Sequence, residues 1–246
     1  MTPTLLAGAR VYLTEVDPGT GPLAGNVGLH VGDDPALVRR RREALARLIG
    51  RDVVWMDQTH LARVEGAPRL AGASSSLEAP APGEWGPVRA DGIVIDARGW
   101  VGAPGLAVQT ADCLPVVLAA DGGRVVAAVH AGRRGLLGGI LTRAVDAIRE
   151  LADGPIDALI GPAICGSCYE VPAQMVRESE AVVPGIGAVT SWGTPSLDLP
   201  RAAAVLLADA GVCVEIDPRC TLEDGDLFSY RADPACGRQA LIIVPA

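Results

Sequence analysis

The pattern of apolar positions predicts a chain of mixed helices and strands. In residues 34–50 apolar side chains recur at helical spacing, where Asp34 can cap the helix, Pro35 suits its first turn and Gly50 ends it. Further helices are expected over 135–154, where Gly154 closes the pattern, after Pro172, and over 198–211 with Asp198 as cap. Strand-like runs cover 53–56, 91–99, 105–120, 124–132, 156–164, 212–216 and 239–244. This order indicates the mixed α/β (α+β) class.

Residues 65–90 interrupt the pattern, because they are rich in Pro, Gly, Ser and Ala and carry no apolar period. We expect a flexible surface loop there. Strand-like runs lie on both sides of this loop, and we therefore interpret residues 1–246 as a single catalytic domain.

Composition and charge narrow the classes of function. No apolar run is long enough to cross a membrane and the first residues lack a signal-peptide pattern, so we expect a cytoplasmic protein with no membrane partner. The net charge of −8 opposes binding to nucleic acid. All basic residues are arginines, which excludes Schiff-base chemistry and a phosphate-loop lysine. Arginines 39–42 occupy consecutive helical positions, and we interpret them as solvated charge.

Three residues carry the most chemistry, and each lies where a regular segment gives way to polar or glycine-rich chain. His60, Cys113 and His130 offer two imidazoles and a thiolate, a set that zinc accepts with its fourth position open. Such an ion lowers the pKa of its water toward about 7. Together with Met56, the same three residues suit a blue-copper centre.

A metal-free site is also consistent with these residues. Cys113 could act as nucleophile and His130 as base, with Asp112 or His60 orienting the base. The spacing leaves all three interpretations open. Only a full multicopper oxidase is excluded, because a three-copper cluster needs more imidazoles than three histidines supply.

The remaining cysteines give weaker signals. Cys165 and Cys168 form one CxxC pair without a second, and Cys213, Cys220 and Cys236 are scattered, so we interpret them as small buried thiols. The HxE and PCxxC signature of the zinc deaminases is absent. Any deamination of adenosine by this protein would therefore use a fold different from that of the zinc deaminases.

Several motifs in order resemble one family. These are "GNVGLHVGDDP", "DQTH", "ADG", "TADCLPVVLA", "VHAGRRG", "IGPAICGSCYEV" and "CT…LFSYR…GRQA". Together they resemble the YfiH-type family, once called laccase-domain or polyphenol oxidase proteins and now regarded as purine nucleoside phosphorylases that also deaminate adenosine. The resemblance runs from the first of these motifs to the C-terminus.

The resemblance implies a zinc ion held by His60, Cys113 and His130. It implies phosphorolysis of adenosine, inosine and methylthioadenosine and hydrolytic deamination of adenosine, with purine nucleosides and phosphate as partners. The implied fold is a four-layer α/β/β/α sandwich with mixed sheets, similar to the catalytic domain of cytotoxic necrotizing toxins. Nothing in the sequence specifies an oligomer. Two alternatives stay open: a copper-dependent (Cu²⁺) polyphenol oxidase and a catalytically weak zinc-binding paralogue.

The matched motifs also imply the other members of the pocket. The expected proton carriers are Asp112 and Glu170, and Arg134 and Arg231 are the candidates for holding phosphate, because a guanidinium matches phosphate oxygens. The expected substrate-binding residues are Asn26, His30, Gln58, Arg134, Tyr169 and Arg231.

Three positions depart from the family pattern. Arg133 stands where the family has the tryptophan of "HAGW", Ala232 where it has the second arginine of "SYRR", and Arg41 where it has an asparagine before arginine. The loss at Ala232 weakens the case for phosphate binding, and Arg133 is a candidate replacement for the missing charge.

Overall fold

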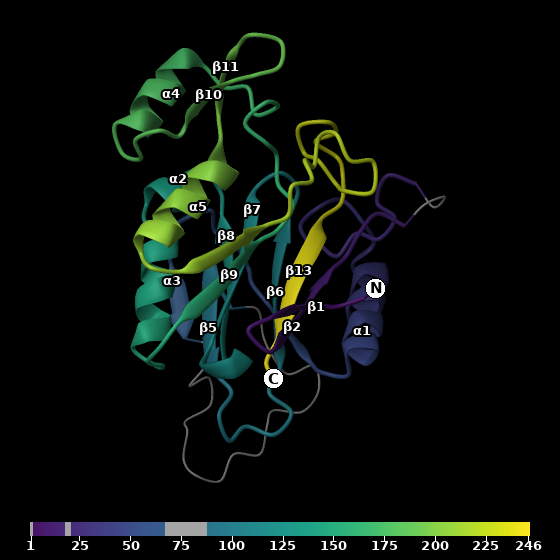
Figure 1. The fold of residues 1–246 in the computed structure, drawn as a ribbon. Coiled ribbons are helices and arrows are strands. Elements are labelled where there is room, and N and C mark those ends of the chain that lie inside the picture. Colours follow the sequence, from purple (N-terminus) through teal and green to yellow (C-terminus); the bar gives the residue numbers. More distant parts are fainter. Residues whose placement is uncertain (1, 18–20, 67–87) are drawn as a thin grey trace.

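Two mixed β-sheets packed face to face form the centre of the protein (Figure 1). The computed structural model describes residues 2–17, 21–66 and 88–246. The first sheet has the strand order β1-β2-β13-β6-β3 and the second β12-β9-β7-β8-β5-β4. The first contains β1 (Thr4–Leu6), β2 (Ala9–Leu13), β3 (Val53–Trp55), β6 (Gly105–Thr110) and β13 (Gln239–Val244). The second contains β4 (Val64–Gly66), β5 (Gly92–Asp96), β7 (Leu114–Ala120), β8 (Val125–Ala131), β9 (Ile156–Ile160) and β12 (Cys213–Ile216).

The facing surfaces of the sheets bury one shared core. Val108 of β6 and Ile243 of β13 pack in the same cluster as Val117 of β7 and Val126 of β8, and all four side chains are fully buried. Because both faces of the central strands are covered, their sequences are continuously apolar rather than alternating. This explains why the runs that contain β6, β7, β8 and β13 show no period of two.

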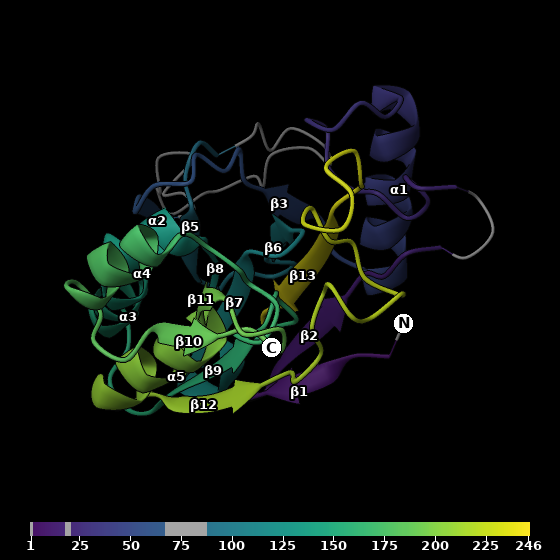
Figure 2. The ribbon, with the colours of Figure 1, turned by 90° about the horizontal axis from the view of Figure 1, so that it is seen from above.

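Helices cover the outer surfaces of both sheets (Figure 2). On the first sheet, α1 packs Ile49 and Leu45 against Tyr12 and Ile242. On the second, α3 and α5 share a core with β7, β8 and β9. The helices are α1 (Pro35–Ile49), α2 (Arg133–Leu137), α3 (Ile140–Arg149), α4 (Ala173–Glu180) and α5 (Leu199–Asp209), with a short 3-10 helix η1 (Asp121–Gly123). A separate hairpin is formed by β10 (Gly187–Val189) and β11 (Pro195–Leu197). The predicted mixed α+β class with mixed sheets is confirmed.

Capping residues predicted the positions of two helices correctly. The side chain of Asp34 accepts a hydrogen bond from Ala36 N, and Gly50 closes α1 in a left-handed conformation. Asp198 accepts from Arg201 N at the start of α5. These caps satisfy backbone groups that a helix end leaves unpaired, which is why the sequence alone located both helices.

Two expectations about continuity were wrong. The run 105–120 is not one strand: β6 and β7 belong to different sheets, and the chain crosses between them at Asp112, whose φ is +84°. The helix expected over 135–154 is divided into α2 and α3, because Gly139 is left-handed (φ +77°), and α3 already ends at Arg149, before Gly154. Continuous apolarity reveals burial but not a change of sheet.

The expectation of four solvated arginines was wrong for two of them. Arg41 forms an ion pair with Asp33 (2.6 Å), and the guanidinium of Arg42 lies 4.0 Å from the ring centroid of Trp55. Arg39 and Arg40 are exposed, as expected. The difference arises because one side of α1 faces the first sheet and the segment that precedes the helix.

The loop expected over 65–90 was wrong at its first two residues, because Glu65 and Gly66 belong to β4, which pairs in parallel with β5. Residues 67–87 lie outside the described residues. Within the described part of the chain, no helix has the length and apolarity needed to cross a membrane. The strands β1 and β2 were not predicted, since only the short turn at Ala7 and Gly8 marks them.

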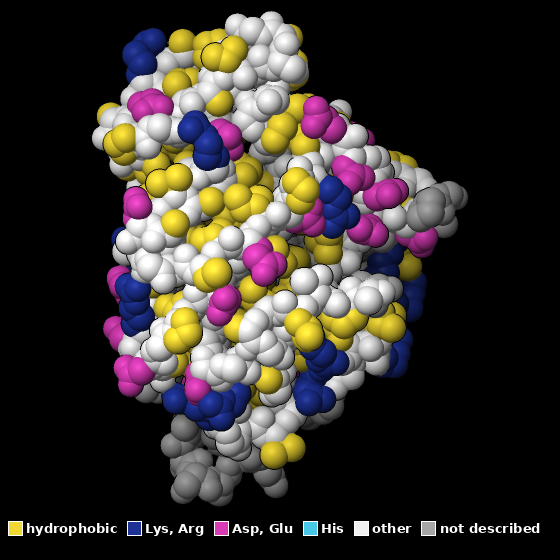
Figure 3. Space-filling view, in the orientation of Figure 1, with side chains coloured by type: hydrophobic (Ala, Val, Ile, Leu, Met, Phe, Trp, Pro, Cys, Tyr) yellow, Lys and Arg dark blue, Asp and Glu magenta, His cyan; other side chains and the backbone are white. Residues whose placement is uncertain are grey.

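The face of the molecule shown in Figure 3 exposes hydrophobic side chains near its middle. Val205 of α5 and Ile216 of β12 line a shallow apolar hollow between these elements, with 53% and 45% of their surface exposed. These side chains therefore contribute little to the core.

The shared core predicts unequal effects of two matched substitutions. Ile243→Ala should lower the free energy of unfolding by about 2–5 kcal/mol, because it opens a cavity between the sheets, whereas Ile216→Ala should change it by less than about 0.5 kcal/mol. Urea unfolding of both variants measures the difference. Equal effects would contradict the face-to-face packing.

Candidate metal centre

Two histidines and a cysteine that are distant in sequence meet at one point. The ligand atoms of His60, Cys113 and His130 all lie within 4.8 Å of one another. The rings of His60 and His130 meet edge to face, with centroids 4.7 Å apart. His130 is buried and His60 is exposed, so the group has one protected side and one side open to solvent.

The crossing between the sheets places Cys113. Leu114, the first residue of β7, pairs with Ala131, and Pro115 pairs with His130 of β8. Cys113 therefore comes at the end of β7 nearest His130. The left-handed conformation of Asp112 turns the chain from β6 into this position, and His60 also has a positive φ of +58°. Non-glycine residues in this region are uncommon and gather at functional sites.

Asp91 organises the group, and the sequence did not identify it. Its buried carboxylate accepts hydrogen bonds from Thr59 Oγ1, from the backbone N–H groups of His60 and Leu61, and from His130 Nδ1 at 2.9 Å. Because Nδ1 is occupied by Asp91, His130 presents Nε2 to Cys113. The signal available was the "ADG" motif, a carboxylate directly before a buried strand.

Electrostatics favour charged forms of these side chains. Burial raises the pKa of Asp91, but hydrogen bonds from His130, Thr59 and Leu61 outweigh it and hold the pKa at about 2. Burial likewise raises the pKa of Cys113, but His130 and His60 lower it to about 6. Burial lowers the pKa of His130, whereas Asp91 and Cys113 raise it to about 9. The protein's own groups therefore favour a thiolate at Cys113.

The residues present fit a metal ion. A thiolate and two imidazoles form a donor set suited to zinc or copper, and the carboxylate behind His130 is the usual support of a metal-binding histidine. Gly132 keeps space beside the donors, since a Cβ there would lie 3.1 Å from Cys113 Sγ and 3.5 Å from His130 Nε2. Met56 is buried in the core between the sheets.

The metal-free interpretation needs one correction. The group that orients His130 is Asp91, not Asp112 or His60. The carboxylate of Asp112 instead accepts bonds from Thr221, Ser229 and the backbone N–H of Arg231. These bonds tie the segment 221–231 to the residue that precedes Cys113.

Tyr169 and Arg231 lie beside this group. The guanidinium of Arg231 is 5.4 Å from the ring centroid of Tyr169. Burial raises the pKa of Tyr169, the charge of Cys113 adds to the rise, and Arg133 and Arg231 oppose it. Two arginines, Arg133 and Arg231, therefore lower the pKa of Tyr169 through their charge. Of the two arginines that follow the "HAG" motif, Arg133 is the one with this effect. Arg134, which the sequence singled out, is exposed.

The other predicted pocket residues have different environments. Glu170 accepts a hydrogen bond from Trp192 Nε1. Gln58 bonds through both ends of its amide to the backbone of Gln109 on β6. Burial lowers the pKa of His30, and the charges of Arg238, His60 and Arg42 lower it further, which places His30 on the His60 side.

Asn26 is fully buried and its amide is fully used. It donates to Gly28 O and Asp33 Oδ2 and accepts from Gly28 N and Arg238 N. Four bonds are the full capacity of this side chain. Asn26 thus fixes the segment that carries His30.

Comparison with known proteins identifies the family. Residues 20–246 match the family described as multi-copper polyphenol oxidoreductase laccase. The chain belongs to this family. It is 44% identical over 221 residues to a Streptomyces griseus protein named purine nucleoside phosphorylase, covering 87% of this chain and 84% of the relative. It is 34% identical over 228 residues to the Shigella flexneri purine nucleoside phosphorylase YfiH, covering 89% and 85%.

A solved structure shares the fold of this laccase-family chain. Neisseria meningitidis protein NMB0706 superposes with a TM-score of 0.82 at 32% identity, over 100% of this chain and 98% of the other. The resemblance to the YfiH-type proteins is therefore confirmed.

The role of Asp91 predicts a loss of metal affinity. Asp91→Asn should weaken zinc binding by about 10- to 100-fold, because the amide no longer fixes the His130 ring with a charged acceptor. Competition with a chromophoric chelator measures the dissociation constant. Asp96→Asn, at the far end of β5 and paired with Arg98, is the matched control and should leave the affinity unchanged. Equal affinities of all three proteins would refute the supporting role.

Proposed function

We propose that this protein is a zinc-dependent purine nucleoside enzyme that carries out phosphorolysis of adenosine, inosine and methylthioadenosine and hydrolytic deamination of adenosine. The convergence of His60, Cys113 and His130 beside Tyr169 and Arg231 carries the proposal. The names of its relatives as purine nucleoside phosphorylases support the substrate class.

The ligand residues would hold the ion and leave one side open. When bound, zinc supplies Lewis-acid polarisation of the atom that faces this open side. Asp91 keeps the Nδ1 proton of His130 away from the ion, so that Nε2 is free to ligate. Gly132 keeps the approach clear of a side chain.

In phosphorolysis a phosphate oxygen forms a bond to ribose C1′ while the bond from C1′ to the purine nitrogen breaks, and the leaving purine takes up a proton. Arg231 holds the phosphate, and Arg133, which lies near Tyr169, assists it. Arg133 thereby replaces the positive charge that is lost where Ala232 stands in place of the family's arginine. Arg134 stays a third candidate for phosphate.

The remaining roles follow from position. Glu170 and Asp112 are the proposed proton carriers, and Asp112 also holds the segment with Arg231 through three hydrogen bonds. His30 and Gln58 line the side of the proposed pocket toward His60 and β6. Asn26 contributes indirectly, because it fixes the segment that carries His30. Deamination at C6 of adenosine is proposed for the same pocket.

The proposal extends to architecture. The whole chain acts as one catalytic domain, with a four-layer α/β/β/α sandwich like that of the cytotoxic necrotizing toxins. The packing of α1 on one sheet and of α3 and α5 on the other supports the layering.

The family description favours one second candidate, a copper-dependent polyphenol oxidase. The donors of two imidazoles and one thiolate also accept copper. A third outcome, a weak zinc-binding paralogue, follows if the departures at Arg133 and Ala232 remove activity.

Activity is tested by incubating purified protein with adenosine and phosphate and following adenine, inosine and hypoxanthine by chromatography. We expect adenine from phosphorolysis and inosine from deamination, both lost in Cys113→Ala and retained in Cys213→Ala, which removes an exposed thiol. If the protein forms no more product than Cys113→Ala does, the result would contradict the nucleoside activity and favour the weak zinc-binding paralogue. Copper-dependent oxidation of a phenol would instead support the polyphenol oxidase.

The phosphate role of Arg231 predicts a selective change in KM. Arg231→Ala should raise the KM for phosphate about 10- to 100-fold, since a charge-assisted hydrogen bond contributes about 1.5–3 kcal/mol. Arg133→Ala should act in the same direction. The exposed helix residue Arg40 provides the control substitution. A KM for phosphate that is unchanged in both site variants would remove phosphate binding from these arginines.

A further inference from the structure

A second group of potential ligands lies outside the centre described above. Three thiols and a carboxylate have ligand atoms within 4.8 Å of one another; the three-thiol cluster consists of Cys165, Cys168, Cys220 and Glu223. The sequence interpretation treated Cys220 as unrelated to the CxxC pair. The structure brings it directly onto that pair: the backbone N–H of Cys165 donates to Cys220 Sγ at 3.4 Å.

The cluster is built from two matching turns. Cys168 N and Tyr169 N both donate to Cys165 O, and Glu223 N and Asp224 N both donate to Cys220 O. Each turn therefore presents ligands at positions i and i+3, in the spacing C-x-x-C and C-x-x-E. A bridge between Ala163 and Cys220, with Thr221 N donating to Ala163 O, fixes the turns side by side.

Burial and Cys220 raise the pKa of Cys165 and Cys168, so both thiols keep their protons until an ion displaces them. One backbone N–H group, that of Cys165, donates to a sulfur of the cluster, Cys220 Sγ, as in metal-binding knuckles. Only glycine fits at position 166 of this turn, because a Cβ there would lie 2.7 Å from the Cβ of Asp198 at the start of α5. The turn is thereby held in one conformation against that helix.

The chemistry of the donors points to zinc. Thiolates select soft or borderline ions, and a tetrahedral set of three sulfurs and one oxygen is a closed set of the structural type. A zinc–sulfur bond of about 2.3 Å puts tetrahedral ligands about 3.8 Å apart, so sulfurs within 4.8 Å need to move inward by at most about 1 Å.

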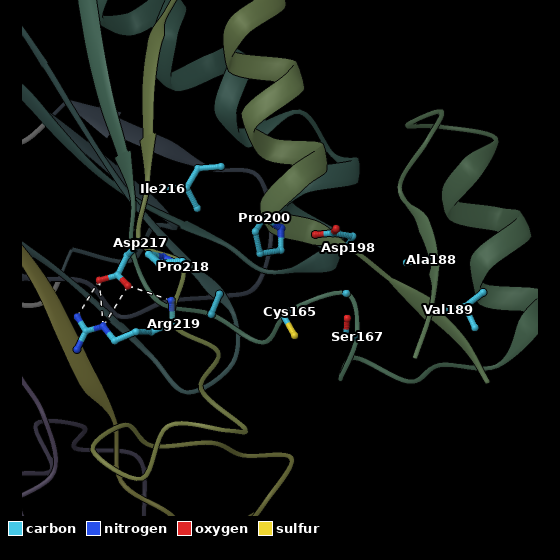
Figure 4. Close-up of a pocket in the computed structure, with 12 residues that line it drawn as sticks. Cys165, Ser167, Ala188, Val189, Asp198, Pro200, Ile216, Asp217, Pro218 and Arg219 are labelled. Carbon is cyan, nitrogen blue, oxygen red and sulfur yellow. Dashed lines mark hydrogen bonds and ion pairs between the residues drawn. The ribbon is translucent and has the colours of Figure 1, made fainter. Parts of the chain in front are cut away.

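An entry path reaches the cluster. Cys165 lines a cavity of about 240 Å³, with Ser167 and Asp198 on one side and Asp217 and Arg219 on the other (Figure 4). Cys168 and Cys220 lie behind it, 3% and 5% exposed, and Glu223 is exposed. Solvent therefore reaches one sulfur and the carboxylate, while the other two sulfurs are protected.

We propose that the three-thiol cluster is a second, structural zinc site, distinct from the open centre at His60, Cys113 and His130. On binding, each ligating thiol releases its proton to solvent and the ion links the segment 163–170 to the segment 220–231. The first segment carries Tyr169, and the second carries Thr221, which donates to Asp112 beside Cys113. The ion thus positions both sides of the pocket without facing substrate.

Zinc content per chain tests the proposal independently of any nucleoside activity. Cys113→Ala disables the open centre, and this variant should retain one zinc equivalent after dialysis against a weak chelator. Adding Cys165→Ser and Cys220→Ser in that background should remove it. Adding Cys213→Ser, an exposed cysteine outside both clusters, should not.

Cobalt substitution checks the ligands. In Cys113→Ala, cobalt should give thiolate-to-metal charge-transfer absorption and the intense visible bands of a tetrahedral site. Glu223→Gln should shift the visible bands and keep the charge transfer. A Cys113→Ala protein that is folded by circular dichroism yet binds neither ion overturns the proposal. So does metal binding that survives loss of both Cys165 and Cys220. If the serine variants fail to fold, the Cys113→Ala and Glu223→Gln measurements decide.

Discussion

The buried carboxylate of Asp91 is the interaction on which the site depends. It joins three pieces of chain: the turn at Thr59 to Leu61, the start of β5 and the side chain of His130 on β8. An ionised group without solvent contact is stable only when hydrogen bonds replace its lost water, and here four donors do so. The same bonds set the ring orientation of His130 and the backbone of His60, so folding and ligand geometry are coupled.

The change of sheet between β6 and β7 positions Cys113, the third candidate ligand. Because β6 and β7 belong to different sheets that share one core, the chain crosses from one sheet to the other between these two strands. Cys113 lies at this crossing, with Asp112 in a left-handed conformation just before it. The hydrogen bonds that Thr221 and Ser229 donate to Asp112 connect this crossing with the segment that carries Arg231. A rigid core thus holds groups that come from distant parts of the sequence.

The sequence identified the three candidate ligands but not the carboxylate that supports them. His60, Cys113 and His130 stood out because each ended a regular apolar segment, and caps at Asp34 and Asp198 located two helices. Asp91 was missed because the "ADG" motif places a carboxylate before a strand but does not show which distant side chains that carboxylate contacts. The pairing of Cys220 with the CxxC turn was missed because spacing along the chain does not report contacts between distant loops. Continuous apolar runs likewise concealed the change of sheet, since burial on both faces looks the same in either sheet.

The central claim is that His60, Cys113 and His130 bind one metal ion together. An anomalous difference map at the zinc absorption edge, from crystals of the protein purified with zinc, tests it most directly. The account predicts a peak between Cys113 Sγ, His130 Nε2 and a ring nitrogen of His60, with Asp91 still bonded to His130 Nδ1. A map with no peak there, and with Cys113 hydrogen-bonded directly to His130, would contradict it.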